Sequence, residues 1–343
     1  MFRSIYLLTI PFLFTLTTLV NAAEITTPDG TRCEGEVSSG KLNGQGMCEY
    51  PNGAKYEGEF VDGQPEGEGV YTFADGGRYQ GEFEGGEIQG QGVWEFANGD
   101  RYEGEVFGGE FQGQGVFISA QGARYEGEFE AGSPSGTGAY LTPNGDRCEG
   151  EVKDGQLNGQ GVCEYGTGNR YEGELVNGRR QGEGVYVLAN GDRYEGGFNN
   201  GQFEGQGTYI YAEGGRYEGE FQAGKFQGQG VREYANGNQY EGEFNAGNPD
   251  GQGVLTLANG NRYEGEFNQG QMSGQGVYIF ANGDRCEGEL QDGNFNGEAV
   301  CKYADGDQYQ GEFKDGKKHG QGVYEYADGT RVEGVWEDGE FQK

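Results

Sequence analysis

The feature that most constrains this chain is a period of 23 residues that continues through nearly all of its length. Steps of 23 from Cys33 reach the same kind of residue, usually Tyr, without an insertion or a deletion. Such a strict period indicates repeated supersecondary units, each of which buries its apolar side chains against its neighbours. The fourteen residues reached, numbered position 1 of each repeat, are Cys33, Tyr56, Tyr79, Tyr102, Tyr125, Cys148, Tyr171, Tyr194, Tyr217, Tyr240, Tyr263, Cys286, Tyr309 and Val332.

Each repeat carries the pattern of two strands. Positions 1 to 5 alternate aromatic, Glu, Gly, Glu and aromatic, as in Tyr56 to Phe60, and positions 14 to 18 carry a second alternating set that includes Tyr71 and Phe73. Alternation with a period of two is typical of a half-buried strand. Gly at position 8 and Asn-Gly or Asp-Gly at positions 20 and 21 indicate turns. The glycines at positions 3 and 14 share the aromatic face and leave room for a neighbouring ring to lie across the backbone.

Composition alone would suggest disorder, but the repeat explains it. Hydrophobic residues make up 33% of the 343 residues and the net charge is −33, yet aromatic residues reach 13%. Nearly all of the 73 glycines fall in five columns of the repeat. The negative charge disfavours nucleic acids and anionic membranes as partners and favours cations or basic partners.

The first 22 residues have the three-part plan of a secretory signal peptide. Arg3 is their only charge, an apolar stretch covers residues 5–20, and small residues precede a cleavage point after Ala22 or Ala23. The alternative is an uncleaved anchor, but the stretch is short for a membrane span and contains a proline. We therefore predict secretion, to the extracellular space or to the periplasm or cell envelope of a Gram-negative bacterium.

The repeats resemble MORN repeats (membrane occupation and recognition nexus). The segments that carry the resemblance are Tyr56 to Phe60, Asp62-Gly63 and Gly67 to Gly69, and the best match to the family pattern is residues 309–322. The resemblance covers residues 33–339. It implies an all-β fold, an elongated, twisted, single-layer antiparallel sheet of consecutive β-hairpins. It also implies scaffolding, dimerisation or lipid association, and no catalytic residues.

The resulting division of the chain has three parts. Residues 1–22 are the predicted signal peptide, residues 23–32 a lead-in, and residues 33–343 an array of thirteen full repeats and a partial fourteenth.

Six cysteines replace the usual residues at positions 1 and 16 of three repeats, always together. This joint replacement indicates that positions 1 and 16 face each other across the hairpin, within the reach of a disulfide. The predicted secretion adds an oxidising compartment. Reduced cysteines and metal ligation are the alternatives, although the spacing and a single histidine, His319, do not resemble a zinc motif. We predict three disulfides, between Cys33 and Cys48, Cys148 and Cys163, and Cys286 and Cys301.

The same pairing fixes the connection between repeats. The next tyrosine stays on the same face only if the connection has an odd number of residues. We therefore predict a three-residue Asn-Gly-Asp loop with a glycine bulge.

The sequence favours a non-catalytic, secreted scaffold that binds a protein partner or a second copy of itself through the aromatic face. Catalysis needs unique residues in a cleft, whereas nearly every acidic residue here is one copy of a column. No catalytic, cofactor or metal-binding residue is therefore predicted, and no cofactor. The candidate contact residues are Tyr56, Tyr102, Tyr125, Tyr171, Tyr194, Tyr217 and Tyr240.

Three other functions stay open at this point. The same rings could contact a glycan on a cell surface. Calcium-dependent binding is a second alternative, because Asn98-Gly-Asp100 and Asn190-Gly-Asp192 recur along one edge, although such motifs first indicate turns. Association with membrane lipids, which the family name suggests, is opposed by the negative charge of the chain.

Overall fold

The computed structural model describes residues 22–342 and divides into two compact units, the first ending at Gly138 and the second beginning at Ala139. The described residues form strands and turns, with no helix among them. Except for Ala22, the predicted signal peptide lies outside this range. The strands of the first unit are β1 (Ala23–Thr26), β2 (Arg32–Ser38), β3 (Lys41–Glu49), β4 (Lys55–Val61), β5 (Gln64–Thr72), β6 (Arg78–Glu84), β7 (Glu87–Glu95), β8 (Arg101–Phe107), β9 (Glu110–Ile118) and β10 (Arg124–Glu130).

The second unit continues the same alternation of shorter and longer strands, and β11 (Ser133–Leu141) contains the boundary. Its strands are β12 (Arg147–Lys153), β13 (Gln156–Glu164), β14 (Arg170–Val176), β15 (Arg179–Val187), β16 (Arg193–Asn199), β17 (Gln202–Ile210), β18 (Gly215–Gln222), β19 (Lys225–Tyr234), β20 (Gln239–Asn245), β21 (Asn248–Thr256), β22 (Arg262–Asn268), β23 (Gln271–Ile279), β24 (Arg285–Gln291), β25 (Asn294–Lys302), β26 (Gln308–Lys314), β27 (Lys317–Glu325), β28 (Arg331–Glu337) and β29 (Glu340–Phe341).

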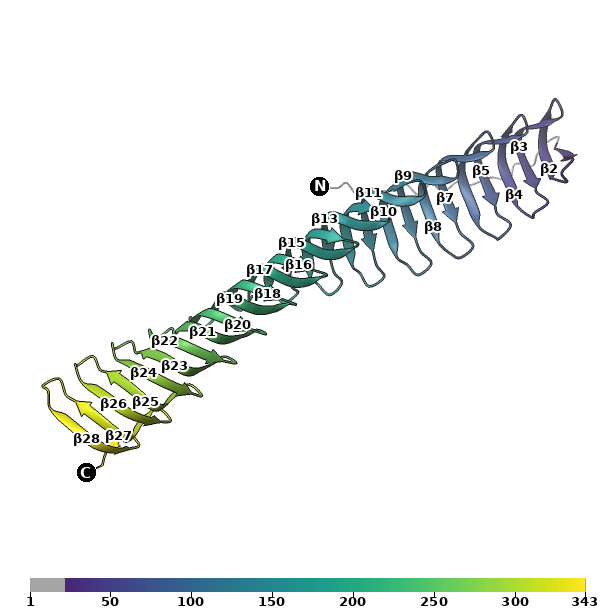
Figure 1. Cartoon of the computed structure of the whole chain (residues 1–343). Coiled ribbons are helices and arrows are strands. Elements are labelled where there is room, and N and C mark those ends of the chain that lie inside the picture. The colour runs from purple at the N-terminus through teal and green to yellow at the C-terminus, as the bar shows by residue number, and fades with distance from the viewer. Residues whose placement is uncertain (1–21, 343) are drawn as a thin grey trace. The chain divides into compact units, whose positions relative to one another are not determined.

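Within each unit every strand pairs antiparallel with the strands before and after it in the chain (Figure 1). Position 1 lies opposite position 16 of its own repeat, as Tyr56 does opposite Tyr71. Position 16 also lies opposite position 1 of the next repeat, so that Tyr71 faces Tyr79. The expected all-β fold of consecutive hairpins, with aromatic residues of successive repeats on one face, is therefore confirmed.

Two kinds of turn connect the strands. Within a repeat, Val61 pairs with Gln64 around the two-residue turn Asp62-Gly63, and both turn residues have positive φ, which is the type I′ hairpin geometry. Between repeats, the Phe73 amide donates to Gly77 O and the Gly76 amide donates to Phe73 O. The loop therefore has three residues, with Gly76 at φ 94° as the bulge. The predicted length is confirmed, but the loop is Ala-Asp-Gly here, one position earlier than predicted.

The second strand of each repeat begins earlier than the alternation suggested. It begins at position 9 and contains a bulge. In the pair of β4 and β5, for example, β5 is the longer strand and the register shifts between Gly58 and Glu59 of β4. Gly67, at position 12, has φ 61°, a conformation that glycine adopts at little cost. The sequence showed this glycine but not its role, because bulge residues break the period of two on which strand prediction rests.

The core of each repeat is a tyrosine that covers two glycines. A Cβ atom on Gly58 or Gly69 would lie under 3 Å from the Tyr56 side chain, so the ring rests directly on the backbone of both strands. Its hydroxyl donates to Glu59 O at 3.0 Å, and the residue is fully buried. This confirms the expected ring across the paired glycines. It also satisfies the one polar atom of a buried ring.

Phenylalanines join neighbouring cores. The Tyr56 ring meets Phe60 of its own repeat at 5.0 Å and Phe83 of the next repeat at 4.8 Å, both edge to face. In other repeats position 10 adds a third ring, as where Phe111 stacks on Tyr102 at 3.7 Å. Because each tyrosine packs against two repeats, no repeat buries its core alone.

Hydrogen bonds between successive turns reinforce both edges. At one edge, Asp100 accepts a bond from the Ala120 amide in the next turn at 2.8 Å. At the other, Gln89 accepts one from the Gly108 amide at 3.0 Å, and the Gly109 amide donates to Ile88 O. The polar residues at positions 11 and 22 are thus repeat-to-repeat contacts, which a column of mixed Asn, Asp, Gln and Glu did not reveal.

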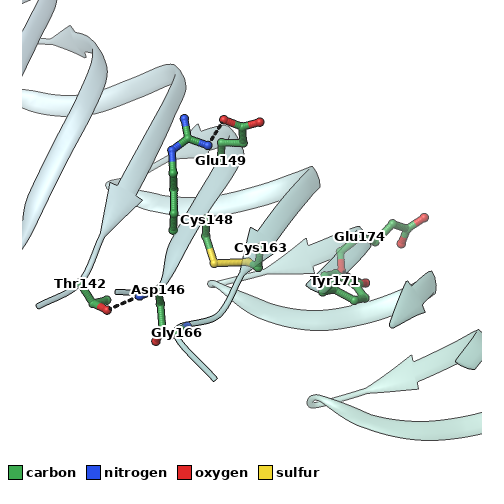
Figure 2. Close-up of a disulfide and its surroundings, with 9 residues drawn as sticks. Thr142, Asp146, Cys148, Glu149, Cys163, Gly166, Tyr171 and Glu174 are labelled. Carbon is green, nitrogen blue, oxygen red and sulfur yellow. Dashed lines mark hydrogen bonds and ion pairs between the residues drawn. A yellow bond between two sulfur atoms is a disulfide. The ribbon is translucent and has the colours of Figure 1, made fainter. Parts of the chain in front are cut away.

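Three repeats replace the tyrosine with a disulfide. Cys33–Cys48, Cys148–Cys163 and Cys286–Cys301 are joined, with Cα atoms 4.0–4.1 Å apart. Figure 2 shows the second bond between β12 and β13, beside Tyr171 of the next repeat. Position 10 is also buried in these three repeats, where it is Leu42, Leu157 and Phe295.

Removal of one disulfide should loosen its hairpin alone. For Cys148→Ser/Cys163→Ser we expect a local loss of about 3 kcal/mol, the chain-entropy value for a 15-residue loop, or roughly 100-fold faster amide exchange in β12 and β13. Hydrogen exchange measured by mass spectrometry checks this. The matched control Cys148→Tyr/Cys163→Tyr, which copies Tyr171 and Tyr186, should recover part of the protection. Unchanged exchange in the serine variant would contradict the account.

A substitution at position 7, the first residue of the turn within each repeat, should stabilise the chain. Every non-glycine residue with positive φ in the described chain stands at position 7, and Ala246 is one of them at φ 50°. Alanine tolerates this conformation poorly, whereas Asn adopts it readily. Ala246→Asn should therefore stabilise the chain by about 0.5–1 kcal/mol.

The reverse change is the control. Asn200 has the same backbone conformation at φ 49°, so Asn200→Ala should destabilise by a similar amount. Thermal unfolding of the two variants should shift in opposite directions, and shifts of the same sign would reject the explanation.

Candidate functional site

The two faces of the sheet differ in chemistry. Positions 2, 4 and 23 place Glu and Arg on what we call the carboxylate face. Arg101 pairs with Glu103 at 2.6 Å and Arg170 with Glu172 at 2.8 Å. The Arg170–Glu172 pair is exposed and contributes little to stability, whereas Arg101–Glu103 is partly covered. Elsewhere on this face Glu68 lies opposite Glu82. Partial burial, and then repulsion from Glu82, raises the pKa of Glu68.

The other face, formed by positions 1, 3, 5, 10, 16 and 18, is the aromatic face. The structure corrects the choice of contact residues on it. None of the predicted tyrosines is more than 3% exposed, because each ring lies beneath its neighbours and on the paired glycines. Sequence reasoning found the aromatic column but could not tell which ring of each repeat is covered. The tyrosines concerned are Tyr56, Tyr102, Tyr125, Tyr171, Tyr194, Tyr217 and Tyr240.

Burial also fixes the chemical state of these tyrosines. Burial raises the pKa of Tyr171 to about 12, although Arg180 acts in the opposite direction. Burial likewise raises the pKa of Tyr217 to about 12. Both hydroxyls stay protonated at neutral pH and donate to backbone oxygens, of Glu174 at 2.7 Å and Glu220 at 2.9 Å. Their role is structural.

The accessible rings of the first unit stand at positions 10, 16 and 18 instead. Phe73 stacks on Trp94 at 5.1 Å, and Trp94 stacks on Phe96 at 5.5 Å. All three remain partly exposed. Trp94 also contacts the buried Tyr79 edge to face at 5.6 Å, so the accessible rings rest on the core. Partly exposed rings in this unit are Tyr50, Tyr71, Phe73, Trp94, Phe96, Phe111 and Phe117.

The second unit has a similar aromatic face, with cations among the rings. Arg180 lies over Tyr186 at 4.4 Å, and Arg232 lies over Tyr234 at 4.6 Å. Lys318 lies 4.2 Å from the Tyr324 ring, and burial lowers the pKa of its ammonium group. The partly or fully exposed rings of this unit at positions 16 and 18 are Tyr140, Tyr165, Tyr186, Tyr209, Tyr211, Tyr234, Tyr278, Phe280, Tyr303, Tyr324 and Tyr326.

The Asn-Gly-Asp turns serve the fold in this structure. Asp100 accepts bonds from the Ala120 amide and the Asn98 side chain. Asp192 accepts from the Ala212 amide at 2.8 Å and from the Tyr209 hydroxyl at 2.7 Å. In residues 22–342, no group of three or more His, Cys, Asp or Glu side chains is arranged to hold a metal ion. These residues also contain no helix long and apolar enough to cross a membrane.

Similarity to known structures is weak. The TCP10 domain of Danio rerio CPAP has 14% identity and a TM-score of 0.25, covering 64% of this chain and 94% of that one. The SAS-4 (dCPAP) TCP domain of Drosophila melanogaster, in complex with a proline-rich motif of Ana2, has 13% identity and a TM-score of 0.25, covering 59% and 94%. A virginiamycin B lyase from Staphylococcus aureus has 12% identity and a TM-score of 0.14, covering 75% and 88%. With scores this low, none indicates what this chain binds.

The sequence of the chain identifies the family to which it belongs. A search of curated proteins finds no significant match. The family model of the MORN repeat, however, matches thirteen consecutive segments from residue 33 to residue 331, each 23 residues long. Their boundaries coincide with the repeats that begin at Cys33, Tyr56 and the other residues at position 1. The chain therefore belongs to the MORN-repeat family.

Proposed function

We propose that this chain is a secreted, non-catalytic scaffold that binds another protein through the partly exposed rings of its aromatic face. The observation that carries the proposal is the stacked row Phe73, Trp94 and Phe96. In the first unit, the strands form a single layer (Figure 1), and these three rings stay partly exposed. Exposed apolar patches of this kind commonly mark interaction sites, and Trp and Tyr are enriched where proteins bind tightly.

Several features support the remaining parts of the proposal. The three disulfides fit an oxidising compartment and hence secretion. A scaffold role fits a family in which each repeat is a structural unit without catalytic residues of its own. Self-association through the same rings remains an outcome of the experiment below.

A glycan is the second candidate ligand, and the ring geometry disfavours it in the first unit. Sugars usually bind the open face of an aromatic ring. Trp94 is nearly parallel to both Phe73 and Phe96, with interplanar angles of 10° and 9°. Because stacking occupies ring faces, this row is better suited to interdigitate with side chains of a partner protein.

Photo-crosslinking in the native host tests the proposal. We expect benzoylphenylalanine at position 73, on the aromatic face, to form adducts that contain protein. At position 107, where Phe107 is 69% exposed on the carboxylate face, we expect few adducts. Mass spectrometry of the adducts identifies a partner or a second copy of the chain.

Substitutions drawn from the same columns provide the control for folding. Phe73→Thr/Phe96→Ser introduces residues already present at position 18 as Thr142 and Ser119, so the hairpins should fold. With the crosslinker placed at position 71, this variant should lose at least 10-fold in adduct yield, whereas Phe107→Glu should not. Equal yields from both faces, or adducts with glycan alone, would refute the proposal.

A further inference from the structure

Arg232 occupies a position that the repeat normally reserves for an aromatic ring. It stands at position 16, where the preceding repeats carry Tyr186 and Tyr209, and it lies opposite the buried Tyr217 and Tyr240. A guanidinium group has therefore been placed on the aromatic face, among Tyr211 at 5.7 Å, Phe226 at 5.6 Å and Tyr234 at 4.6 Å. Ring contacts satisfy its charge only in part.

Arg232 makes no hydrogen bond or ion pair within the described chain. Its Nε is buried and has no hydrogen-bond partner. Among residues 22–342, no carboxylate forms an ion pair with this side chain, although the chain carries 57 acidic residues. Arg216, in the neighbouring strand, instead pairs with Glu218 and Glu233 on the carboxylate face. An arginine without an acceptor in this setting is an incomplete interaction.

Arg180 shows the contrast on the same face. It also lies among rings, but one of its terminal nitrogens donates to Gly201 O at 2.6 Å. Its hydrogen bond links two repeats, so its role is accounted for within the fold. Arg232 has no such bond.

At positions 7 and 22, the repeats near Arg232 carry no acidic residue. At position 7, repeats from Asn177 to Gln269 have no acidic residue, whereas the repeats that follow have Asp292 and Asp315. At position 22, Gly215, Asn238 and Asn261 stand where several other repeats have Asp. Lower local negative charge favours the approach of an anionic group to this part of the face.

Several carboxylates of the repeats around Arg232 either accept hydrogen bonds from backbone amides or lie in exposed turns. Glu204 and Asp250 accept bonds from the amides of Ala223 and Gln269, at 3.0 and 3.2 Å. Glu213 lies exposed in the turn after β17. Asp192, which also acts on Tyr211, accepts bonds from the Tyr209 hydroxyl and the Ala212 amide. None of these four carboxylates forms an ion pair with Arg232 within the described residues.

We infer that the aromatic face around Arg232 binds a partner segment in which a carboxylate side chain is flanked by aromatic or aliphatic residues. The carboxylate accepts charge-assisted hydrogen bonds from the guanidinium group, while its apolar neighbours pack on Tyr211, Phe226 and Tyr234. The inference rests on the proposed function and specifies the chemistry of the partner. It runs against the net charge of −33, which by itself favours basic partners.

A random 12-residue peptide library, selected against the chain from residue 23 onward, tests the inference. We expect the wild-type chain to enrich peptides with Asp or Glu next to aromatic residues. Arg232→Leu should remove that acidic preference, and it should fold because Leu255 occupies the same column in the next repeat. Arg180→Leu, which copies Leu157 of the same column, should leave the preference unchanged.

Affinities of one selected peptide give the second measurement. Arg232→Leu and a Glu→Gln change in the peptide should each weaken binding by about 10- to 100-fold, and together by little more than either alone. Enrichment of aromatic peptides without acidic residues would overturn the inference and leave the proposed function intact. The inference would also be overturned if the selection enriched purely basic peptides that bind the wild-type chain and Arg232→Leu equally well. If neither the wild-type chain nor Arg232→Leu enriches any peptide, both the inference and the proposed function fail.

Discussion

The contact of a tyrosine ring with two paired glycines holds this structure together. A strand glycine normally weakens a sheet, since it lacks a side chain to pack. Here the missing side chains of Gly58 and Gly69 create the space that Tyr56 fills. The ring then reaches Phe83 of the next repeat, so one interaction closes a hairpin and joins it to its neighbour. A chain with only 33% hydrophobic residues can build a core in this way, because the buried tyrosines and phenylalanines are large.

The same contact explains an exception in the glycine columns. Position 14 is Gly in every complete repeat except one, which has Ala299. That repeat has Cys286 at position 1 in place of Tyr, joined to Cys301. Without a ring over the strand pair, a methyl group fits. In this repeat the disulfide thus replaces the tyrosine as a link across the hairpin and leaves room for alanine at position 14. The other two disulfide repeats keep Gly46 and Gly161.

The sequence predicted the structure best at positions where a residue type has a single structural role. The joint replacement of Tyr and aromatic by Cys148 and Cys163 predicted the cross-strand register and the disulfide. Strand alternation did not predict the bulge at Gly67, where the backbone leaves the period of two. It also could not distinguish the covered Tyr171 from the accessible Tyr186, because both stand on the aromatic face and only packing separates them. Arg232 was not singled out, since its meaning depends on the lack of a partner in space.

The functional account follows from this arrangement. Tyrosines at position 1 are committed to the core, so the proposed partner would meet the rings at positions 10, 16 and 18. The variable residues in those columns give each part of the face its own chemistry. Phe73, Trp94 and Phe96 form an apolar row in the first unit. Arg232 provides a cation in the second.

The most direct measurement of the central claim is amide exchange in Gly207→Ala, compared with Ala299→Gly. A Cβ atom at position 207 would lie under 3 Å from the Tyr194 ring, so the account predicts much faster exchange in β16 and β17. Ala299→Gly, in a repeat without that tyrosine, should change exchange little in β24 and β25. Equal protection of Gly207→Ala and the unmodified chain would contradict the claim that the ring on the glycine pair holds the repeat together.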